Sequence, residues 1–390
     1  MSISFLLNED QEMIREAAHE FARDVVRPAA THHDETGEYP WEVLSQAWEA
    51  GLMNTHVPEA CGGAAMSQLD SLLIAEELAW GCSGIGTAME ANGLAQQPVI
   101  VGGSDFLHQK YLAPQVDSLK SDGRPMMCAY ALTEPGAGSD VQALSSRAVK
   151  RGDKWILNGS KMWITNGGVA DWYFVVALTD PEKKARGGMT AFIVEKDWPG
   201  VIIGAKEKNL GQRASDTRAL TFEDVEIPEE NVVGQVGDGW KLAMTAFDYT
   251  RPAVSCAAVG VARAAMEHSI DYARQRKTFG KPIFAHQGVS FMIADMAMNI
   301  DAGRLLCWQA ASLKDQGVSN TKQAAFAKAF CADMCMKVCT DAVQVFGGYG
   351  YSQEYPVEKL MRDAKIFQIY EGTSQIQRVI MTKELFTRRR

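Results

Sequence analysis

The chain has 390 residues, 46% of them hydrophobic and 22% charged, which is typical of a globular protein with two or three domains. Its formal net charge of −9 argues against general binding to nucleic acid or to anionic membranes. No apolar run is long enough to span a membrane, and residues 1–10 lack the pattern of a secretory signal, so we expect neither membrane insertion nor secretion.

The first part of the chain, residues 1–122, is predicted to form an N-terminal α-helical domain. Apolar residues recur there at spacings of three and four, the period of an amphipathic helix. The predicted helices cover 9–30, 41–50, 68–80, 83–100 and 106–112. The first of them is expected to end near Pro28, since proline interrupts a helix.

The middle part, residues 123–236, changes to short β-rich runs separated by Gly, Asn, Asp and Pro. The predicted strands cover 126–132, 154–157, 162–165, 172–177, 190–194, 201–203 and 219–222. Turn signals at such regular intervals favour a small antiparallel β-domain.

The last part, residues 237–390, returns to long amphipathic helices. They are predicted over 254–276, 287–314, 322–346 and 357–366, followed by a helix from Thr373 to about residue 386. Four helices of this length are typical of a four-helix bundle. The sequence therefore predicts an α+β fold with a helical domain, an antiparallel β-domain and a C-terminal helical bundle.

The eight cysteines show neither a CxxC pair nor the Cys/His spacing of a zinc site. Cys331, Cys335 and Cys339 recur every four residues, which places them on one helix face. A packed stripe explains this spacing better than a metal or redox site does. We therefore expect reducing, intracellular and metal-free chemistry.

The segment Ile-Tyr-Glu-Gly-Thr-Ser-Gln-Ile-Gln-Arg, residues 369–378, combines an acid with a glycine just before a predicted helix. Gly372 would let a ligand approach the backbone closely beside Glu371. Thr373 is a predicted N-cap, and the free N–H groups of a helix start can bind an anion. The alternative is a capped helix with an ordinary surface glutamate.

Two further segments are candidates for holding a flat or phosphorylated ligand. The turn 133–140, Thr-Glu-Pro-Gly-Ala-Gly-Ser-Asp, follows a strand and exposes N–H groups and hydroxyls, although a purely structural turn is an alternative. Trp163 and Thr165 lie two residues apart on a strand and should point the same way, unless Trp163 is plain core. The absence of GxGxxG and Walker A motifs disfavours a Rossmann or P-loop nucleotide site.

Two helix ends are also unusual. The segment 274–280, Arg-Gln-Arg-Lys-Thr-Phe-Gly, closes a helix with three cations, which suit the helix dipole or a diphosphate. The segment 344–350, Gln-Val-Phe-Gly-Gly-Tyr-Gly, ends another helix with three glycines, of which a C-cap explains one.

Six motifs occurring together and in order resemble the acyl-CoA dehydrogenase family, most closely its medium-chain members. These motifs are TEPGAGSD, KMWITN, RKTFG, QVFGG, MRDAKI and IYEGTSQIQR. The resemblance covers essentially the whole chain, and the helix–sheet–helix order matches the family fold.

The resemblance implies an FAD enzyme that oxidises fatty acyl-CoA thioesters to trans-2-enoyl-CoA. Glu371 matches the family's catalytic base, which removes the α-proton while the β-hydrogen passes as hydride to flavin N5. Some relatives carry the base at the position of Thr250, which cannot take a proton from carbon. The family polarises the thioester carbonyl with the backbone N–H of the base and a flavin hydroxyl. Desolvation by acyl chain and flavin should raise the pKa of the base.

The resemblance also implies the remaining site residues. The flavin contacts within one subunit are Tyr130, Leu132, Thr133, Gly138, Ser139, Trp163, Ile164, Thr165, Thr373 and Gln375. The residues that reach the flavin of a neighbouring subunit are Arg276, Thr278, Phe279, Gln287, Gln344, Val345, Gly347 and Gly348. The substrate contacts are Glu90, Ser139, Asp248, Arg251, Tyr370 and Gly372.

The implied partners are the acyl-CoA substrate, an electron-transferring flavoprotein as electron acceptor, and further copies of the chain in a homotetramer, a dimer of dimers. The implied location is the cytoplasm of a bacterium or, for a mature form without its transit peptide, the mitochondrial matrix.

Chain-length preference depends on the predicted floor of the acyl pocket. Glu90 matches the medium-chain glutamate, but Gly86 replaces a bulkier glutamine, which suggests a deeper pocket. The segment 304–308 resembles short-chain members instead. The competing hypotheses are a short-chain or broad-range dehydrogenase, an acyl-CoA oxidase using dioxygen, a catalytically silent flavin- or CoA-binding scaffold and a structural helical protein.

Overall fold

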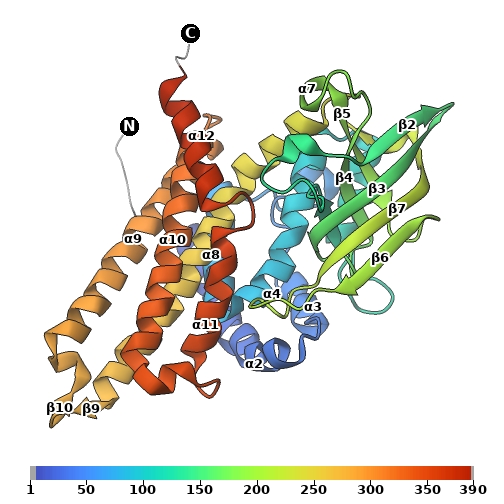
Figure 1. Ribbon diagram of the computed structural model, residues 1–390. Helices are drawn as coiled ribbons and strands as arrows, with labels where there is room; N and C mark the ends of the chain where they lie inside the picture. Colours follow the sequence, from blue (N-terminus) through green and yellow to red (C-terminus); the bar gives the residue numbers. More distant parts are fainter. Residues whose placement is uncertain (1–5, 388–390) are drawn as a thin grey trace.

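A computed structural model describes residues 6–387 of the chain. Residues 1–5 and 388–390, at the ends of the two predicted terminal domains, lie outside the described residues. Residues 1–5 are also half of the segment 1–10 that was considered for a secretory signal. The described residues form a helical layer, a twisted sheet and a bundle of long helices (Figure 1). None of the described helices is long and apolar enough to cross a membrane.

The first helical region begins at Asn8, whose side chain caps the first helix by accepting from the N–H of Gln11. Its α-helices are α1 (Glu9–Phe21), α2 (Arg27–Thr36), α3 (Trp41–Glu49), α4 (Gln68–Gly102), α5 (Asp105–Leu107) and α6 (Pro114–Asp117). The predicted end near Pro28 is wrong, because a π-helical turn over Ala22–Val26 leads directly into α2. Pro28 lies in the first turn of α2, where a missing N–H costs nothing.

The two helices predicted over 68–80 and 83–100 form the single element α4. Its backbone breaks locally at Cys82, with φ −163° and ψ 115°, which marks the predicted gap. α4 packs along α8 (Gly239–Gln275), and α8 begins 15 residues earlier than the predicted start at 254, because 239–253 is also helical.

In the described residues, eight strands form one sheet in the order β6-β7-β3-β2-β4-β5-β8, with β1 paired to β4. The strands are β1 (Cys128–Ala131), β2 (Arg147–Arg151), β3 (Lys154–Thr165), β4 (Trp172–Leu178), β5 (Met189–Glu195), β6 (Val201–Lys206), β7 (Thr217–Pro228) and β8 (Val232–Val233). The sheet is antiparallel as predicted except at two pairings, since β4 pairs in parallel with β1 and, at one position, with β2. The short α7 (Ala185–Gly188) precedes β5.

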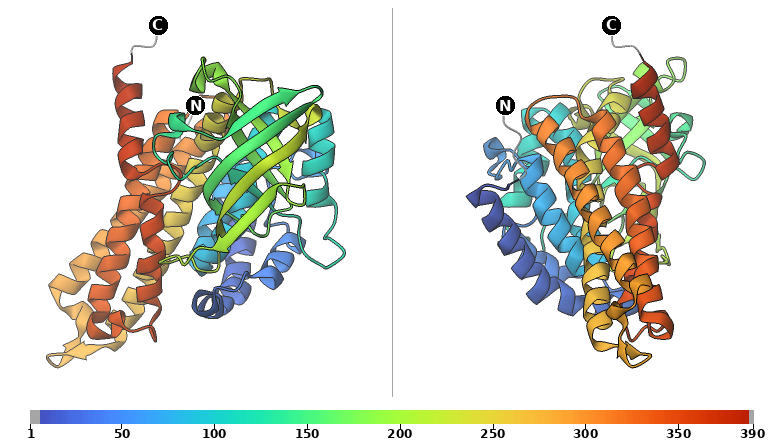
Figure 2. Two further views of the ribbon diagram at one scale, coloured as in Figure 1. Left: turned by 45° about the vertical axis from the view of Figure 1, so that its right-hand side comes forward. Right: turned by 90° about the vertical axis from the view of Figure 1, so that its left-hand side faces the viewer.

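The bundle confirms the predicted helical C-terminal region. It contains α8, α9 (Gln287–Asp315), α10 (Thr321–Phe346), α11 (Pro356–Ala364) and α12 (Ser374–Phe386). The helices α8, α9 and α10 run side by side (Figure 2), and α11 and α12 both pack against α10. A hairpin of β9 (Lys277–Thr278) and β10 (Lys281–Pro282) joins α8 to α9. Cys331, Cys335 and Cys339 are buried in the bundle core, so the predicted packed stripe is confirmed.

Candidate active site

Glu371 lies on the short loop between a 3-10 turn (Lys365–Gln368) and α12. It has a left-handed backbone with φ +54°, and Gly372 follows with φ +87°. A left-handed backbone is unfavourable for glutamate, and such strain often accompanies function. Thr373 then caps α12 by accepting from the N–H of Ile376 at 3.1 Å, which confirms the predicted N-cap.

The carboxylate of Glu371 faces the protein interior. The Thr250 hydroxyl donates to Glu371 Oε2 at 2.9 Å. Burial raises the pKa of Glu371 to about 7, against the opposing effects of Thr250, Arg251 and Lys328. Among the described residues, none accepts a hydrogen bond from the backbone N–H of Glu371. An acid that titrates near neutrality beside a free N–H is not an ordinary surface glutamate.

Three other side chains lie within the electrostatic reach of this carboxylate. Burial, with a smaller contribution from Glu371, raises the pKa of Glu90 on α4 to about 7. Burial also raises the pKa values of Tyr130 and Tyr370, and Glu371 adds to both increases. The structure thus brings together four predicted site residues from α4, β1 and the loop before α12.

Asp248 and Arg251 pair with each other on α8. Arg251 donates to Asp248 Oδ1 at 2.9 Å, and the Thr321 hydroxyl donates to the other carboxylate oxygen at 2.6 Å. Arg251 is buried, with its Nε unpartnered, and its charge favours ionised Glu371. Arg251 therefore connects the predicted CoA contacts to the surroundings of Glu371.

The turn 133–140 is fixed to β3 by a buried ion pair. Lys161 Nζ donates to Glu134 at 2.8 Å and to the carbonyls of Leu132 at 3.1 Å and Val176 at 2.7 Å. The Met162 N–H donates to the Thr133 carbonyl at 2.8 Å. The two predicted ligand-holding segments are therefore neighbours.

Trp163 lies next to this pair at a break in the register of β3 with β7, with φ +62°. It is 58% exposed, whereas Ile164 is buried, so the hypothesis that Trp163 is plain core is wrong. Gly138 and Ser139 are exposed as well. A Cβ added to Gly138 would meet no atom within 4 Å and its φ is not left-handed, so the protein itself does not require glycine there. The missing side chain leaves room for a ligand.

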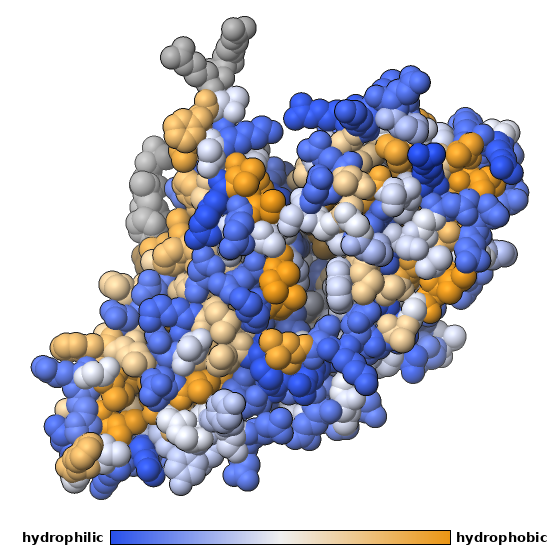
Figure 3. Space-filling model, in the orientation of Figure 1, coloured by the Kyte–Doolittle hydropathy of each residue, from blue (hydrophilic) through white to orange (hydrophobic). Residues whose placement is uncertain are grey.

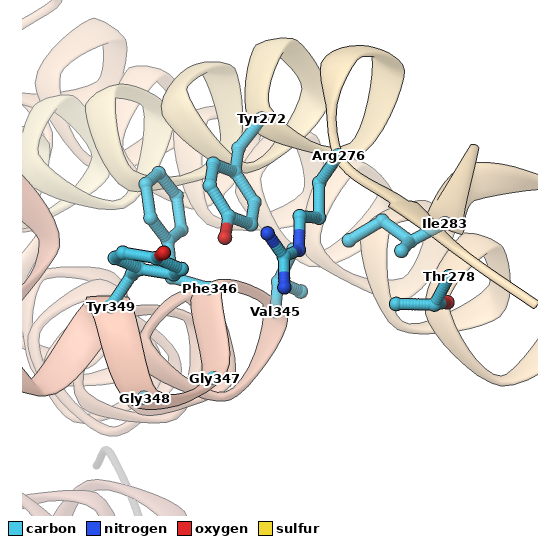
Figure 4. A pocket seen from close by; sticks show the side chains of 9 residues that line it. All are labelled: Tyr272, Arg276, Thr278, Ile283, Val345, Phe346, Gly347, Gly348 and Tyr349. Carbon is cyan, nitrogen blue, oxygen red and sulfur yellow. The ribbon is translucent and has the colours of Figure 1, made fainter.

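A second group of predicted residues lines a pocket of about 540 Å³ at the other end of the bundle (Figure 4). Arg276 lies 5.4 Å from the centre of the Tyr349 ring, and Gly347 and Gly348 have open space where a Cβ would lie. The pocket is lined by Tyr272, Arg276, Thr278, Ile283, Val345, Phe346, Gly347, Gly348 and Tyr349.

Phe279, Gln287 and Gln344 are exposed around this end of the bundle, Phe279 by 96%. Figure 1 places the β9–β10 hairpin far from the sheet that carries Trp163. Within one chain, the structure therefore does not bring the second group of predicted flavin contacts to the first.

Figure 3 shows the surface hollowed between the helical bundle and the β-domain. Thr165 and Thr373 are half-buried and Gln375 is exposed, while Leu132 is buried in the apolar cluster between the sheet and the helices α4 and α8.

Sequence reasoning missed Lys328, which donates to the carbonyl of Gly372 at 2.7 Å, and Gln377, which donates to the carbonyls of Glu371 and Gly372. It also missed the pair of Glu134 with Lys161. A lysine in the middle of the apolar run Ala-Ala-Phe-Ala-Lys-Ala-Phe-Cys is a signal that could have identified Lys328.

Comparison with family models gives three adjoining matches. The N-terminal, middle and C-terminal domains of acyl-CoA dehydrogenase match residues 8–118, 129–225 and 237–386. A probable medium-chain specific acyl-CoA dehydrogenase 2, mitochondrial, from Caenorhabditis briggsae is 46% identical over 385 residues, 98% of this chain and 92% of that protein.

Solved structures are similar over the full length. Butyryl-CoA dehydrogenase from Megasphaera elsdenii has a TM-score of 0.94 and 40% identity, covering 99% of this chain and all of that one. A chain from the structure described as "Electron transferring flavoprotein of Acidaminococcus fermentans: Towards a mechanism of flavin-based electron bifurcation" has a TM-score of 0.95 and 41% identity, with coverage of 99% and 100%.

Proposed function

Because this chain belongs to the acyl-CoA dehydrogenase family, a family of FAD enzymes, we propose that it catalyses α,β-dehydrogenation of saturated acyl-CoA thioesters, with medium-chain thioesters preferred. The observation that carries the proposal is the Glu371 carboxyl group, held on a strained loop with a pKa raised to about 7. A general base acts best when its pKa lies near the working pH. The products are the trans-2-enoyl-CoA and the reduced cofactor.

The residues of the turn 133–140 and of β3 fit FAD. Exposed Trp163, the open backbone at Gly138 and the hydroxyls of Thr133 and Ser139 would hold it, together with Tyr130, Leu132, Ile164, Thr165, Thr373 and Gln375. When bound, FAD supplies the acceptor for the β-hydrogen and its two electrons.

The chain itself would supply the proton chemistry. Glu371 takes the α-proton from the thioester, and the proton remains on its carboxyl group. Its backbone N–H, which has no acceptor among the described residues, is placed to donate to the thioester carbonyl and so to acidify the α-carbon. Asp248 and Arg251 would bind the CoA part, while Glu90 and Tyr370 would contact the acyl chain.

The test is the Glu371→Gln variant, which removes the base and keeps its shape. We expect the variant to bind FAD and octanoyl-CoA, and to leave the flavin absorption unbleached when the thioester is added anaerobically. Glu182→Gln, which changes an exposed glutamate outside the proposed site, is the control and should bleach like the wild type. Rapid bleaching of Glu371→Gln would show that another group is the base.

A short-chain preference is the second candidate, favoured by the similarity to butyryl-CoA dehydrogenase. The medium-chain preference is supported by the 46% identity to the medium-chain relative from Caenorhabditis briggsae. Rates measured from butyryl-CoA to palmitoyl-CoA separate the candidates. A sharp optimum at butyryl-CoA would exclude the medium-chain proposal.

We also propose an electron-transferring flavoprotein as acceptor and a homotetramer in which the pocket around Arg276 completes the flavin site of a neighbouring chain. The separation of the two groups of predicted flavin contacts supports this assembly. The name of the Caenorhabditis briggsae relative, which includes the word mitochondrial, supports a mitochondrial location for a eukaryotic chain.

A further inference from the structure

Lys328 lies in the first third of α10 and is only 1% exposed. Its neighbours along the helix include Ala324, Ala325, Ala327 and Cys331, all buried. Within residues 6–387, no carboxylate lies within ion-pair distance of its ammonium group. The hydrogen bond of Lys328 goes to the carbonyl of Gly372, at 2.7 Å.

A buried ammonium group without an ion-pair partner is unfavourable for folding. Burial lowers the pKa of Lys328 to about 8, while the negative charges of Glu371 and Asp333 raise it. An apolar side chain of similar length would fill the same space without this desolvation cost. The lysine therefore needs a reason other than stability.

We propose that Lys328 is the positioning residue for Glu371, holding the carbonyl of Gly372 and favouring the ionised form of the carboxyl group. This inference rests on the proposed function, because it assumes that Glu371 is the base. Lys328 would act through Glu371 and Gly372, without touching substrate.

The geometry of the loop supports this role. Glu371 and Gly372 are both left-handed, so the loop needs external bonds to keep this shape. Lys328 supplies one of them, and Gln377 Nε2 supplies two more, to the carbonyls of Glu371 at 3.1 Å and Gly372 at 2.9 Å. Asp333, on the same helix as Lys328, accepts hydrogen bonds from side chains on both flanks of the loop, those of Gln368, Ser374 and Arg378.

The charges around Glu371 give the direction of the effect. The titratable and charged groups that face it are Glu90 from α4, Tyr130 from β1, Arg251 from α8, Lys328 from α10 and Tyr370 from its own loop. The two cations lower the pKa of Glu371, and burial raises it. Removing the Lys328 cation should therefore raise the pKa of the base, so that a smaller fraction is ionised at neutral pH.

Two variants separate charge from hydrogen bonding. Lys328→Gln keeps an N–H donor without the charge, and Lys328→Met removes both. In the FAD-loaded enzyme with saturating octanoyl-CoA, we expect the acid limb of the flavin-reduction rate to move to higher pH in both variants. The rate at pH 7 should fall about fivefold for the first unit by which the pKa rises above 7 and about tenfold for each further unit, and recover at higher pH in Lys328→Gln. In Lys328→Met the rate should remain lower at every pH, because the loop also loses its bond.

Lys337→Met is the matched control, because Lys337 lies on the same helix but is exposed and pairs with Asp341. It should leave the pH profile unchanged. A lower melting temperature with an unmoved acid limb in both Lys328 variants would show a merely structural role and overturn the inference. If Lys328→Met does not fold, the acid limb of Lys328→Gln decides alone. An inactive Glu371→Gln beside an unmoved acid limb would reject this inference and leave the proposed function standing, whereas an active Glu371→Gln would reject the base assignment itself.

Discussion

At the scale of single residues, two carboxyl groups determine how the site responds to pH. Glu90 and Glu371 both have pKa values raised to about 7, because burial disfavours their charged forms. The negative charge of Glu371 adds to the increase in the pKa of Glu90. At neutral pH the two groups together hold about one proton more than two solvated carboxyls would. This lowers the free energy of unfolding, and it leaves Glu371 with a pKa suited to a general base.

The raised pKa of Glu90 predicts how the stability of Glu90→Gln depends on pH. The folded protein keeps the pKa of Glu90 near 7, against a usual value of 4.5, so it binds more protons than the unfolded chain between these pH values. Stability contributed by this group is therefore present at pH 4 and lost as the pH rises through 7. Glu90→Gln should be more stable than the wild type at pH 8, by about 3 kcal/mol, and equal to it near pH 4.

Denaturant unfolding of the FAD-loaded protein at the two pH values measures the difference. Glu59→Gln, an exposed glutamate, should show none. Equal stability of Glu90→Gln and wild type at pH 8 would contradict the buried, proton-retaining state of Glu90.

Sequence reasoning reached Glu371 and the cap at Thr373 because both belong to a local pattern of acid, glycine and hydroxyl. It did not reach Lys328, because its partner is a backbone carbonyl 44 positions away. Thr250 was recognised only as unable to act as a base, yet its hydroxyl donates to the carboxylate of Glu371. Contacts between distant segments carry no local spacing that a pattern could show.

At the scale of elements, β3 joins the ligand-holding turn to the rest of the sheet. Glu134 accepts from Lys161 and from the N–H groups of Ser145 and Ser146, at 2.7 to 3.0 Å. These donors lower the pKa of Glu134 to about 2, although burial opposes them. The carboxylate therefore stays charged through the physiological range, and the turn stays fixed.

Lys161→Met should lower the free energy of unfolding by about 3 to 5 kcal/mol, because it leaves Glu134 charged and buried without its cation. It should also reduce FAD content after gel filtration, since the turn 133–140 loses its connection to β3. Lys154, also on β3, forms an exposed ion pair with Glu226 on β7. Lys154→Met removes this pair and should lower the free energy of unfolding by less than about 1 kcal/mol. Similar losses for the two variants would refute a special role for the buried pair.

The predicted elements differ from the structure where burial and sequence pattern disagree. β2 was missed, because its residues Arg-Ala-Val-Lys-Arg have a single buried member, Ala148, and so show no alternation. The strands predicted over 154–157 and 162–165 form the single strand β3. The sequence between them contains Gly159, which is typical of a turn, and the structure has shifts in the register of β3 with β7 there. The helices α9 and α10 were predicted to within one residue at each end, because their apolar faces repeat over many turns.

At the scale of the whole molecule, the motif Met-Arg-Asp-Ala-Lys-Ile connects regions far apart in sequence. Arg362 donates to Asp34 on α2 at 2.7 Å. Asp363 accepts from the N–H of Gln212 at 2.6 Å, from Ser83 on α4 at 3.1 Å and from Lys359 at 2.6 Å. Two adjacent residues of α11 thus hold the N-terminal helices, the β-domain and the bundle together.

Asp363→Asn should destabilise the protein by about 3 kcal/mol, because it leaves the buried Lys359 cation without a carboxylate partner. Asp341→Asn, which removes the partner of exposed Lys337, is the control and should be near neutral. Denaturant unfolding followed by tryptophan fluorescence measures both. A neutral Asp363→Asn would mean that the three regions are held by apolar packing alone.

The exposed end of the bundle predicts cofactor loss in Arg276→Ala. If this pocket completes the flavin site of a neighbouring chain, the variant should retain less FAD on gel filtration, while the rate of flavin reduction per bound FAD changes little. Lys281→Ala, an exposed cation on the same hairpin, is the control. Unchanged FAD content in Arg276→Ala would remove the proposed contact.

The loop that carries Glu371 gains its surroundings from α4, β1, α8 and α10, elements formed by widely separated parts of the chain. Helical hydrogen bonds are local and can form early in refolding, but these surroundings exist only after the three regions have docked. Circular dichroism should therefore recover before turnover when denatured protein is diluted into buffer with FAD. The delay between the two signals measures the docking step, and enzyme activity becomes a kinetic probe of the last stage of folding.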